Sequence, residues 1–245
     1  MTRLKLKSLI EKDSYKTVEI LGKDIVFFVP NELINWRVET LFEKEPETLD
    51  WINKFQNEEK IVFWDIGSNI GLYSIYAALK YKNIEIISFE PSTRELITFY
   101  RNLELNKNIA SKIRIVPMAV GKQTNDFLSL TYGPSSNTGT NKITDGILCD
   151  EKIPVVEVGK ILGEYYIKKV KLIKIDVEGF ELNVVDSLQD LLIKMSDLHV
   201  VCEINNEMPN SEKIFEIFQT CGFELNNRAH LTNTVNNAIF YKKGI

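Results

Sequence analysis

Apolar and polar residues alternate in blocks along most of this chain, and the blocks predict strands and helices in turn. Short apolar runs that indicate buried strands lie at 61–64, 84–89, 113–116, 170–176 and 198–204. Amphipathic stretches separate them. One of these follows a capping box at 92–95 and has Leu96, Phe99, Tyr100 and Leu103 at helical spacing. Strands that alternate with helices imply a parallel sheet covered on both faces.

The first 60 residues have a different pattern. Two apolar segments, 17–20 and 25–29, surround a glycine turn and predict a hairpin, and Pro46 begins a predicted helix. We expect residues 1–59 to form a small appendage and residues 60–245 to form the main domain. The remaining predicted elements are a helix at 211–221 and a closing pair of strands at 223–227 and 238–242.

Composition narrows the class of protein. Of 245 residues, 30 are Lys or Arg and 34 are Asp or Glu, so the net charge of −4 offers no general attraction to a nucleic acid. Three cysteines without C-x-x-C spacing predict free thiols in a reducing compartment. No stretch approaches the roughly 20 apolar residues of a membrane span, so we expect a cytoplasmic protein.

A glycine-rich segment, Asp65-Ile-Gly-Ser-Asn-Ile-Gly71, follows the first buried strand and precedes a helix. Such a turn predicts a nucleotide site, with its amides facing outward at the helix N-terminus and Gly71 allowing close packing on the strand. The dinucleotide fingerprint G-x-G-x-x-G is not matched, because Asn69 replaces the second glycine and Asp65 would repel a pyrophosphate. S-adenosylmethionine, with an ammonium and a sulfonium, suits this segment better.

The second strand ends in Glu90-Pro91, roughly 20 residues beyond the glycines, where nucleotide-binding units keep an acid for the ribose hydroxyls. Glu90 is therefore the predicted ribose ligand; a solvated glutamate before a turn is the alternative. Farther along, the polar segment 131–142 is too long for an ordinary connection. We interpret it as a loop on the acceptor side of the site; a plain disordered segment is the alternative.

A second chemical cluster lies in Val170-Lys-Leu-Ile-Lys-Ile-Asp-Val-Glu-Gly-Phe-Glu181. Alternate positions put Lys174, Asp176 and Glu178 on one side of a strand near its carboxyl end, where ligands of open α/β sheets bind. The alternative is an ion-pair network in which Lys174 neutralises both acids. We expect Glu181 only to favour the start of the next helix.

These strings, D-I-G-S-N-I-G, F-E-P and K-I-D-V-E-G-F-E, resemble in order and separation the FkbM-type methyltransferase family. The resemblance implies a class I S-adenosylmethionine fold, Rossmann-like, with a mostly parallel seven-stranded sheet and an antiparallel last strand. It also implies O-methyl transfer, commonly to sugars or natural-product hydroxyls, as in polysaccharide or natural-product biosynthesis. The implied cofactor residues are Asp65, Gly67, Ser68, Asn69, Gly71, Glu90, Pro91, Met118, Ala119 and Asp176. Asn102 and Asn106 match family asparagines that we interpret as helix-end structure.

Methyl transfer to a hydroxyl needs a group that accepts the proton. The candidate catalytic residues are Asp176, Glu178, Glu203, Lys174 and His230. His230 has the most suitable ordinary pKa, and the alternative is a loop histidine that is simply solvated. His199 begins a buried strand and is predicted to be structural. Asp176, Glu178 and Glu203 could instead gather a divalent cation, but Lys174 opposes one, so no metal is expected.

The predicted function is thus S-adenosylmethionine-dependent O-methyl transfer to a small-molecule or carbohydrate acceptor, yielding S-adenosylhomocysteine. Two alternatives remain: an NAD(P)-dependent oxidoreductase with the same fold, and an S-adenosylmethionine-binding module without catalysis. No motif in the chain names the acceptor or an oligomeric state.

Overall fold

The computed structural model describes residues 13–56, 60–122, 127–132, 142–144, 149–226 and 234–244, with only the backbone of 142–144. At its centre is a seven-stranded sheet in the order β12-β13-β11-β10-β3-β4-β5. Its strands are β3 (Ile61–Ile66), β4 (Ile84–Phe89), β5 (Ile113–Val116), β10 (Val170–Ile175), β11 (Leu198–Asn205), β12 (Glu224–Leu225) and β13 (Val235–Lys242).

The adjacent strands β5, β4, β3, β10 and β11 run parallel to one another. β13 pairs antiparallel with both β11 and β12. The predicted mostly parallel sheet with an antiparallel last strand is therefore confirmed. Each of the five predicted buried strands is present within two residues of its expected bounds. Continuous burial along β3 explains the clear sequence signal, because a parallel strand covered on both faces needs apolar residues at successive positions.

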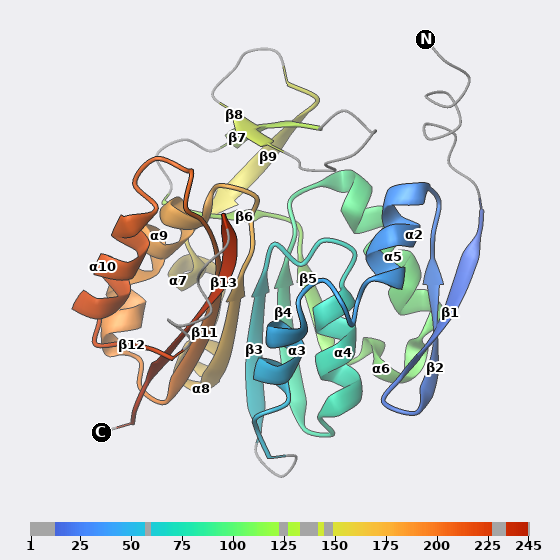
Figure 1. Cartoon of the computed structure of the whole chain (residues 1–245), viewed down its shortest axis with the longest axis horizontal. Coiled ribbons are helices and arrows are strands. Elements are labelled where there is room, and N and C mark those ends of the chain that lie inside the picture. Colours follow the sequence, from blue (N-terminus) through green and yellow to red (C-terminus); the bar gives the residue numbers. More distant parts are fainter. Residues whose placement is uncertain are drawn as a thin grey trace.

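Helices cover both faces of this sheet, as Figure 1 shows. One face carries α4 (Leu72–Lys80), α5 (Thr93–Leu105) and α6 (Lys107–Ala110). The other face carries α9 (Glu181–Lys194) and α10 (Glu212–Thr220). Two short helices, α7 (Val158–Ile161) and α8 (Glu164–Lys169), precede β10. Successive residues of β3 point into opposite cores: Phe63 packs in the core on the α4–α5 side of the sheet, and Trp64 packs in the core on the α9–α10 side.

The N-terminal segment shares the core on the α4–α5 side. It forms the predicted hairpin, β1 (Tyr15–Ile20) and β2 (Lys23–Phe28), then α2 (Glu32–Glu39) and the predicted helix α3 (Pro46–Ile52). Phe27 and Trp51 are fully buried in one cluster with Ile75 of α4. A boundary at residue 59 stays a prediction, since the apolar contacts continue across it.

Two asparagines attach the hairpin to α5. Asn102 accepts a hydrogen bond from the Phe28 amide (2.8 Å) and donates to the Ile70 carbonyl (3.0 Å), while Asn106 exchanges hydrogen bonds with the Val26 backbone. The interpretation as helix-end structure is correct for Asn106, which is the C-cap of α5 and also donates to the Asn102 carbonyl at 2.7 Å, and it is wrong for Asn102, which lies inside the helix. Their side chains satisfy the edge strand β2, and Asn102 also ties it to the glycine turn.

A second, four-stranded sheet was missed by sequence reasoning. It has the order β6-β9-β7-β8, with β6 (Ala119–Val120), β7 (Phe127–Thr131), β8 (Lys142–Thr144) and β9 (Glu151–Val156). Figure 1 shows it above the edge at which β3 and β4 end. β6 and β8 have only two and three residues, which is too few to show a period, and Pro154 within β9 argues against a strand in the sequence. The predicted acceptor-side loop at 131–142 lies mostly outside the described residues.

Two local predictions need correction. Ser92 directs its hydroxyl to the Glu95 carboxylate, so the side chain caps no backbone amide and the capping box is not formed. Tyr100 is half exposed, whereas Leu96, Phe99 and Leu103 are buried as predicted. Within the described segments, no helix combines the length and the apolar character that a membrane span requires.

Candidate active site

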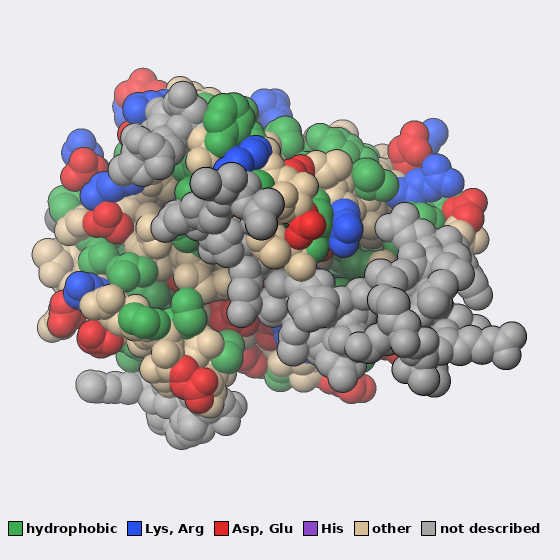
Figure 2. Space-filling view, turned by 90° about the horizontal axis from the view of Figure 1, so that it is seen from above, with side chains coloured by type: hydrophobic (Ala, Val, Ile, Leu, Met, Phe, Trp, Pro, Cys, Tyr) green, Lys and Arg blue, Asp and Glu red, His purple; other side chains and the backbone are tan. Residues whose placement is uncertain are grey.

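A cavity of about 670 Å³ opens at the carboxyl ends of the parallel strands. Its walls come from the glycine turn, the ends of β4, β10 and β11, the strand β6, and the α2–α3 segment. Figure 2 views the molecule from this edge, with Asp and Glu side chains recessed near the centre. Among the predicted cofactor residues, the cavity is lined by Gly67, Ser68, Asn69, Glu90, Pro91, Ala119 and Asp176.

Backbone conformation explains the residue types of the glycine turn. Gly67, Asn69 and Gly71 all have positive φ, at 83°, 53° and 84°, a region that asparagine and glycine tolerate best. A Cβ on Gly67 would lie 1.8 Å from the Asp176 carbonyl oxygen. A Cβ on Gly71 would lie 2.0 Å from the Phe99 ring, so the close packing there is with α5 and not with the strand.

The amides of this turn do not face outward, contrary to prediction. Those of Gly67 and Ser68 donate to the Phe89 carbonyl, at 2.9 and 3.0 Å. The amides of the next three residues donate to the Glu90 carboxylate, the Asn69 side chain and the Ser68 carbonyl. A pyrophosphate would find these five donors already engaged. This arrangement favours a ligand without phosphates.

Asp65 lies beneath the cavity and does not line it. Its side chain is 1% exposed, accepts a hydrogen bond from Ser74 at 2.5 Å, and has a raised pKa because burial disfavours the charged form. In register, Asp65 is the neighbour of Lys174 on β10 and of Ser88 on β4. A direct contact between Asp65 and the amino-acid end of the cofactor stays a prediction.

Glu90 lines the cavity just after β4, held by two backbone amides. One carboxylate oxygen accepts from Asn69 at 2.8 Å and the other from Ser92 at 2.9 Å, which orients both oxygens. Burial, together with the nearby Glu95 carboxylate, raises the pKa of Glu90 to about 8. Each oxygen has a further lone pair, so the carboxylate can receive a diol. Close by, Ala119 lines the cavity, whereas Met118 does not.

Lys174 and Asp176 form a buried ion pair of 2.6 Å at the end of β10. Lys174 is 1% exposed; burial lowers its pKa, but the carboxylates of Asp176, Glu45 and Asp65 raise it more, so the ammonium keeps its proton. Burial likewise opposes ionisation of Asp176, and the charges of Lys174 and Lys44 reverse that effect and lower its pKa. The predicted ion-pair alternative therefore holds for Lys174 and Asp176.

Glu178 does not continue the alternation of the strand. β10 ends at Ile175, and Glu178 has a positive φ of 54°, so the expected single face does not extend that far. Glu178 still lines the cavity at its solvent side, with a pKa raised to about 7 by desolvation and by Asp176. Glu181 accepts from the Val177 and Gly179 amides, both at 3.0 Å, and so closes the start of α9 as expected.

Glu203, on β11, lines the cavity beside Asp176, so carboxylates from two neighbouring strands meet at this end of the cavity. The Asp176 charge and then burial raise its pKa, because a second negative charge is unfavourable beside the first. Among the described residues, its carboxylate has no hydrogen-bond partner. His230 lies outside the described residues. His199 is on β11 against the Phe55 and Tyr241 rings, as its structural interpretation requires.

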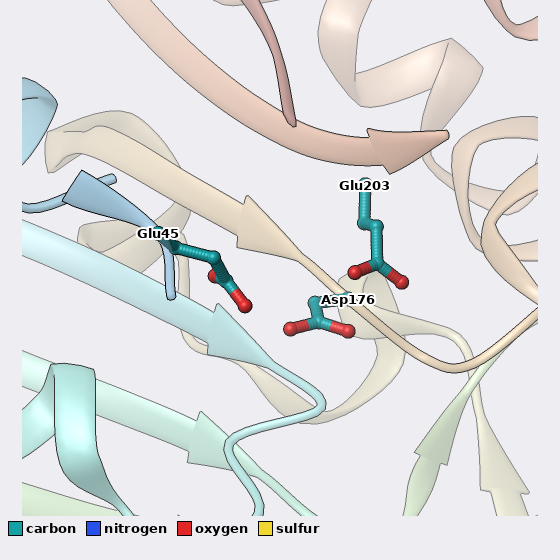
Figure 3. Close-up of side chains that lie close together, drawn as sticks. All are labelled: Glu45, Asp176 and Glu203. Atoms are coloured by element: carbon teal, nitrogen blue, oxygen red, sulfur yellow. The ribbon is translucent and has the colours of Figure 1, made fainter. Parts of the chain in front are cut away.

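Sequence reasoning missed Glu45, which the fold brings to Asp176 and Glu203. One carboxylate oxygen of each lies within 4.8 Å of the others, as Figure 3 illustrates. The cluster supplies oxygen ligands of the kind divalent cations prefer, with Glu45 in the position expected for Glu178. However, the ammonium groups of Lys174 and Lys44 lie against two of these carboxylates, at 2.6 and 2.7 Å, and oppose a cation. Glu45 opens the segment Glu-Pro-Glu-Thr at 45–48, which resembles the usual lead-in of FkbM-type methyltransferases, but that resemblance gave Glu45 no role.

Comparisons with known proteins agree with this geometry. The model of the methyltransferase FkbM domain matches residues 65–225. Methyltransferase 1 of Beauveria bassiana is 29% identical over 174 residues, 62% of this chain and 69% of that protein. The hexuronic acid methyltransferase AglP of Haloferax volcanii is 26% identical over 189 residues, 76% of this chain and 73% of that protein.

The fold itself has a solved counterpart. The crystal structure of a methyltransferase FkbM from Methylobacillus flagellatus superimposes with a TM-score of 0.50 at 16% identity, over 77% of this chain and 44% of that one. The chain thus spans less than half of that protein. The family match covers the glycine turn, Glu90 and the Lys174–Glu181 segment, and this chain belongs to the FkbM family of methyltransferases.

Proposed function

We propose that this protein transfers the methyl group of S-adenosylmethionine to a hydroxyl oxygen of a small-molecule or carbohydrate acceptor. The observation that carries the proposal is one cavity with two chemically different ends. Glu90 and the glycine turn form one end, and the carboxylates of Asp176, Glu178 and Glu203 form the other. The first end suits a nucleoside, and the second suits a hydroxyl that must lose a proton.

The bonding of the glycine turn supports S-adenosylmethionine over a dinucleotide. Because the five amides from Gly67 to Gly71 donate within the protein, no cradle of free donors remains for phosphates. Glu90, oriented by two amides, would hold the ribose diol, and the Ala119 backbone would lie near the adenine. The bound cofactor supplies a methyl group on a positively charged sulfur, which departs as a neutral thioether.

Among the candidate bases, the electrostatics favour Glu203. Asp176 is neutralised by Lys174 and has a lowered pKa, so it holds a proton weakly. Glu203 has a raised pKa and an unpartnered carboxylate within the described structure, so it can accept the hydroxyl proton as the oxygen attacks the methyl carbon. Alignment of the acceptor oxygen with the sulfonium supplies the rest of the acceleration.

The acceptor class rests on two supports of different kinds. The relative from Haloferax volcanii is named as a hexuronic acid methyltransferase. In this chain, the exposed Trp36 indole and Leu33 line the cavity from α2, and an indole face packs well against a sugar ring. A carbohydrate hydroxyl is therefore the acceptor we test first.

Calorimetric titration with S-adenosylhomocysteine and with NADH decides the cofactor. Binding of NADH alone would refute methyl transfer and favour the oxidoreductase alternative. Transfer of a labelled methyl group into a panel of sugars, nucleotide sugars and small hydroxyl compounds then separates an enzyme from a binding module, since a module binds the cofactor and labels nothing.

The pH dependence of turnover tests the base. Because the base must be deprotonated and burial with Asp176 raises the pKa of Glu203 above its ordinary 4.5, kcat should rise with pH through that raised value. Glu203→Gln should lower kcat and abolish this rise while S-adenosylhomocysteine affinity is kept. If the rise survives in Glu203→Gln and disappears in His230→Ala, the histidine is the base.

A further inference from the structure

Several ionisable residues of the N-terminal segment line the cavity, and one of them, Glu45, meets the carboxylates of Asp176 and Glu203. Glu45 immediately precedes α3, at its N-cap, yet its carboxylate accepts no hydrogen bond from the helix backbone. It turns into the cavity, where it is 4% exposed and lies within 4.8 Å of Asp176 and Glu203. An N-cap carboxylate ordinarily satisfies backbone amides, so this orientation needs another reason.

The position of Glu45 is held from two sides. Tyr73, in the first turn of α4, donates its hydroxyl to one carboxylate oxygen at 2.9 Å, and Lys44 pairs with the other at 2.7 Å. Burial and the Glu45 charge raise the pKa of Tyr73, so its hydroxyl remains a donor. These contacts preorganise Glu45 as an acceptor of hydrogen bonds at the same end of the cavity as Glu203.

We propose that Glu45 is a specificity-determining residue: it binds the acceptor hydroxyl adjacent to the one that Glu203 deprotonates, so the enzyme selects a vicinal diol. This inference rests on the proposed function. The carboxylate oxygens of Glu45 and Glu203 lie within 4.8 Å of each other. A pair of neighbouring hydroxyls spans that separation with two hydrogen bonds of about 2.7 Å.

The chemistry at this end favours a diol over a single hydroxyl. A phenol or simple alcohol would satisfy Glu203 and leave the buried Glu45 carboxylate without a ligand partner. A diol satisfies both, and the Glu45 carboxylate, paired with Lys44, is a charged acceptor, which makes its hydrogen bond stronger than a neutral one. The adjacent hydroxyl also fixes which oxygen faces the sulfonium, so Glu45 would set the position that is methylated.

The test compares Glu45→Gln, Tyr73→Phe and the exposed control Glu43→Gln. Each variant is assayed with methyl glucoside, methyl glucuronide, their monodeoxy analogues and two single-hydroxyl compounds, benzyl alcohol and phenol. Melting temperature confirms folding, and titration with S-adenosylhomocysteine measures cofactor affinity. We expect Glu45→Gln to raise the KM for a diol that the wild type methylates by about tenfold or more, which is the effect of losing a hydrogen bond to a charged group.

Tyr73→Phe should raise the same KM less, because it frees Glu45 to move without removing it. The deoxy analogue that lacks the hydroxyl bound by Glu45 should have a high KM in the wild type and no further loss in Glu45→Gln. Glu43→Gln should match the wild type. Cofactor affinity should stay unchanged in all three variants.

Several results would overturn the proposal. An unchanged KM in Glu45→Gln would remove Glu45 from acceptor binding, and weaker cofactor affinity would assign it to the cofactor. Transfer only to benzyl alcohol or phenol, or to no diol of the panel, would contradict diol selection. If EDTA abolishes the wild-type activity and Mg²⁺ restores it, the carboxylates of Glu45, Asp176 and Glu203 bind a metal ion instead of the diol. Absence of S-adenosylhomocysteine binding in the wild type would instead overturn the proposed function, and the inference with it.

Discussion

Replacing the buried Lys174 tests how the acidic end of the cavity is stabilised. The ammonium is 1% exposed, pairs with Asp176 at 2.6 Å, and is close enough to Glu45 and Asp65 for their charges to raise its pKa. Lys174→Met keeps much of the volume and removes the charge, so buried carboxylates lose their main counterion. Breaking a buried pair in this way costs about 3–5 kcal/mol.

For a chain of this size, each kcal/mol corresponds to roughly 2–4 °C in Tm, so Lys174→Met should melt about 6–20 °C lower at neutral pH. Asp176→Asn removes one of the uncompensated charges. The double variant should therefore lose less stability than the two single variants together, with a coupling of about 1 kcal/mol or more. Urea unfolding of the four proteins, with S-adenosylhomocysteine absent, measures the cycle.

The sign of the pH dependence follows from Asp176. Its pKa is lowered in the folded protein, so the pair contributes stability that is complete above the ordinary value of 3.8 and is lost as pH falls through the lowered value. The cost of Lys174→Met should hence be largest near neutral pH and shrink in acid. A cost under about 1 kcal/mol with an additive cycle would refute our account of Lys174 as the counterion.

Three further predictions concern other parts of the site. Glu90→Ala should weaken S-adenosylhomocysteine binding by about 1–3 kcal/mol in calorimetry, because the ribose hydroxyls lose a buried hydrogen-bond partner; an unchanged affinity would contradict its place at the ribose. Gly67→Ala puts a Cβ 1.8 Å from a carbonyl oxygen and should lower both Tm and cofactor affinity, whereas Gly163→Ala, with open space around it, should do neither. Asn102→Ala leaves the Phe28 amide and the Ile70 carbonyl without partners, so we expect the free energy of unfolding measured in urea to fall by about 1–3 kcal/mol. An unchanged free energy of unfolding would mean that water replaces the Asn102 side chain as the partner of both groups.

Patterns among neighbouring residues were sufficient to predict the buried strands and the glycine turn. The buried parallel strands were predictable because each is an uninterrupted apolar run, and the glycine turn because φ angles of 83°, 53° and 84° select glycine and asparagine. The ion pair of Lys174 with Asp176 was among the alternatives for the same reason, since the two residues are separated by one position on a strand.

Residues whose role depends on distant partners were misread or missed. Asn102 was interpreted as helix-end structure, but its side chain accepts a hydrogen bond from the Phe28 amide, 74 positions away. Asp65 stands at the head of the cofactor motif, yet the neighbouring strands enclose it beneath the cavity. The small sheet escaped detection because β6 and β8 are very short, β9 contains a proline, and the pairing joins segments that are separate in the chain.

By itself, then, the sequence determined the α/β architecture, the family resemblance, and the turn and strand ends around which the site is built. These depend on hydrophobic period and backbone conformation, which neighbouring residues set. Only the tertiary structure decided that the turn amides are already bonded and that Glu45 meets Asp176 and Glu203. Those facts depend on how α3, β10 and β11 pack, and spacing along the chain carries no signal for a contact made in three dimensions.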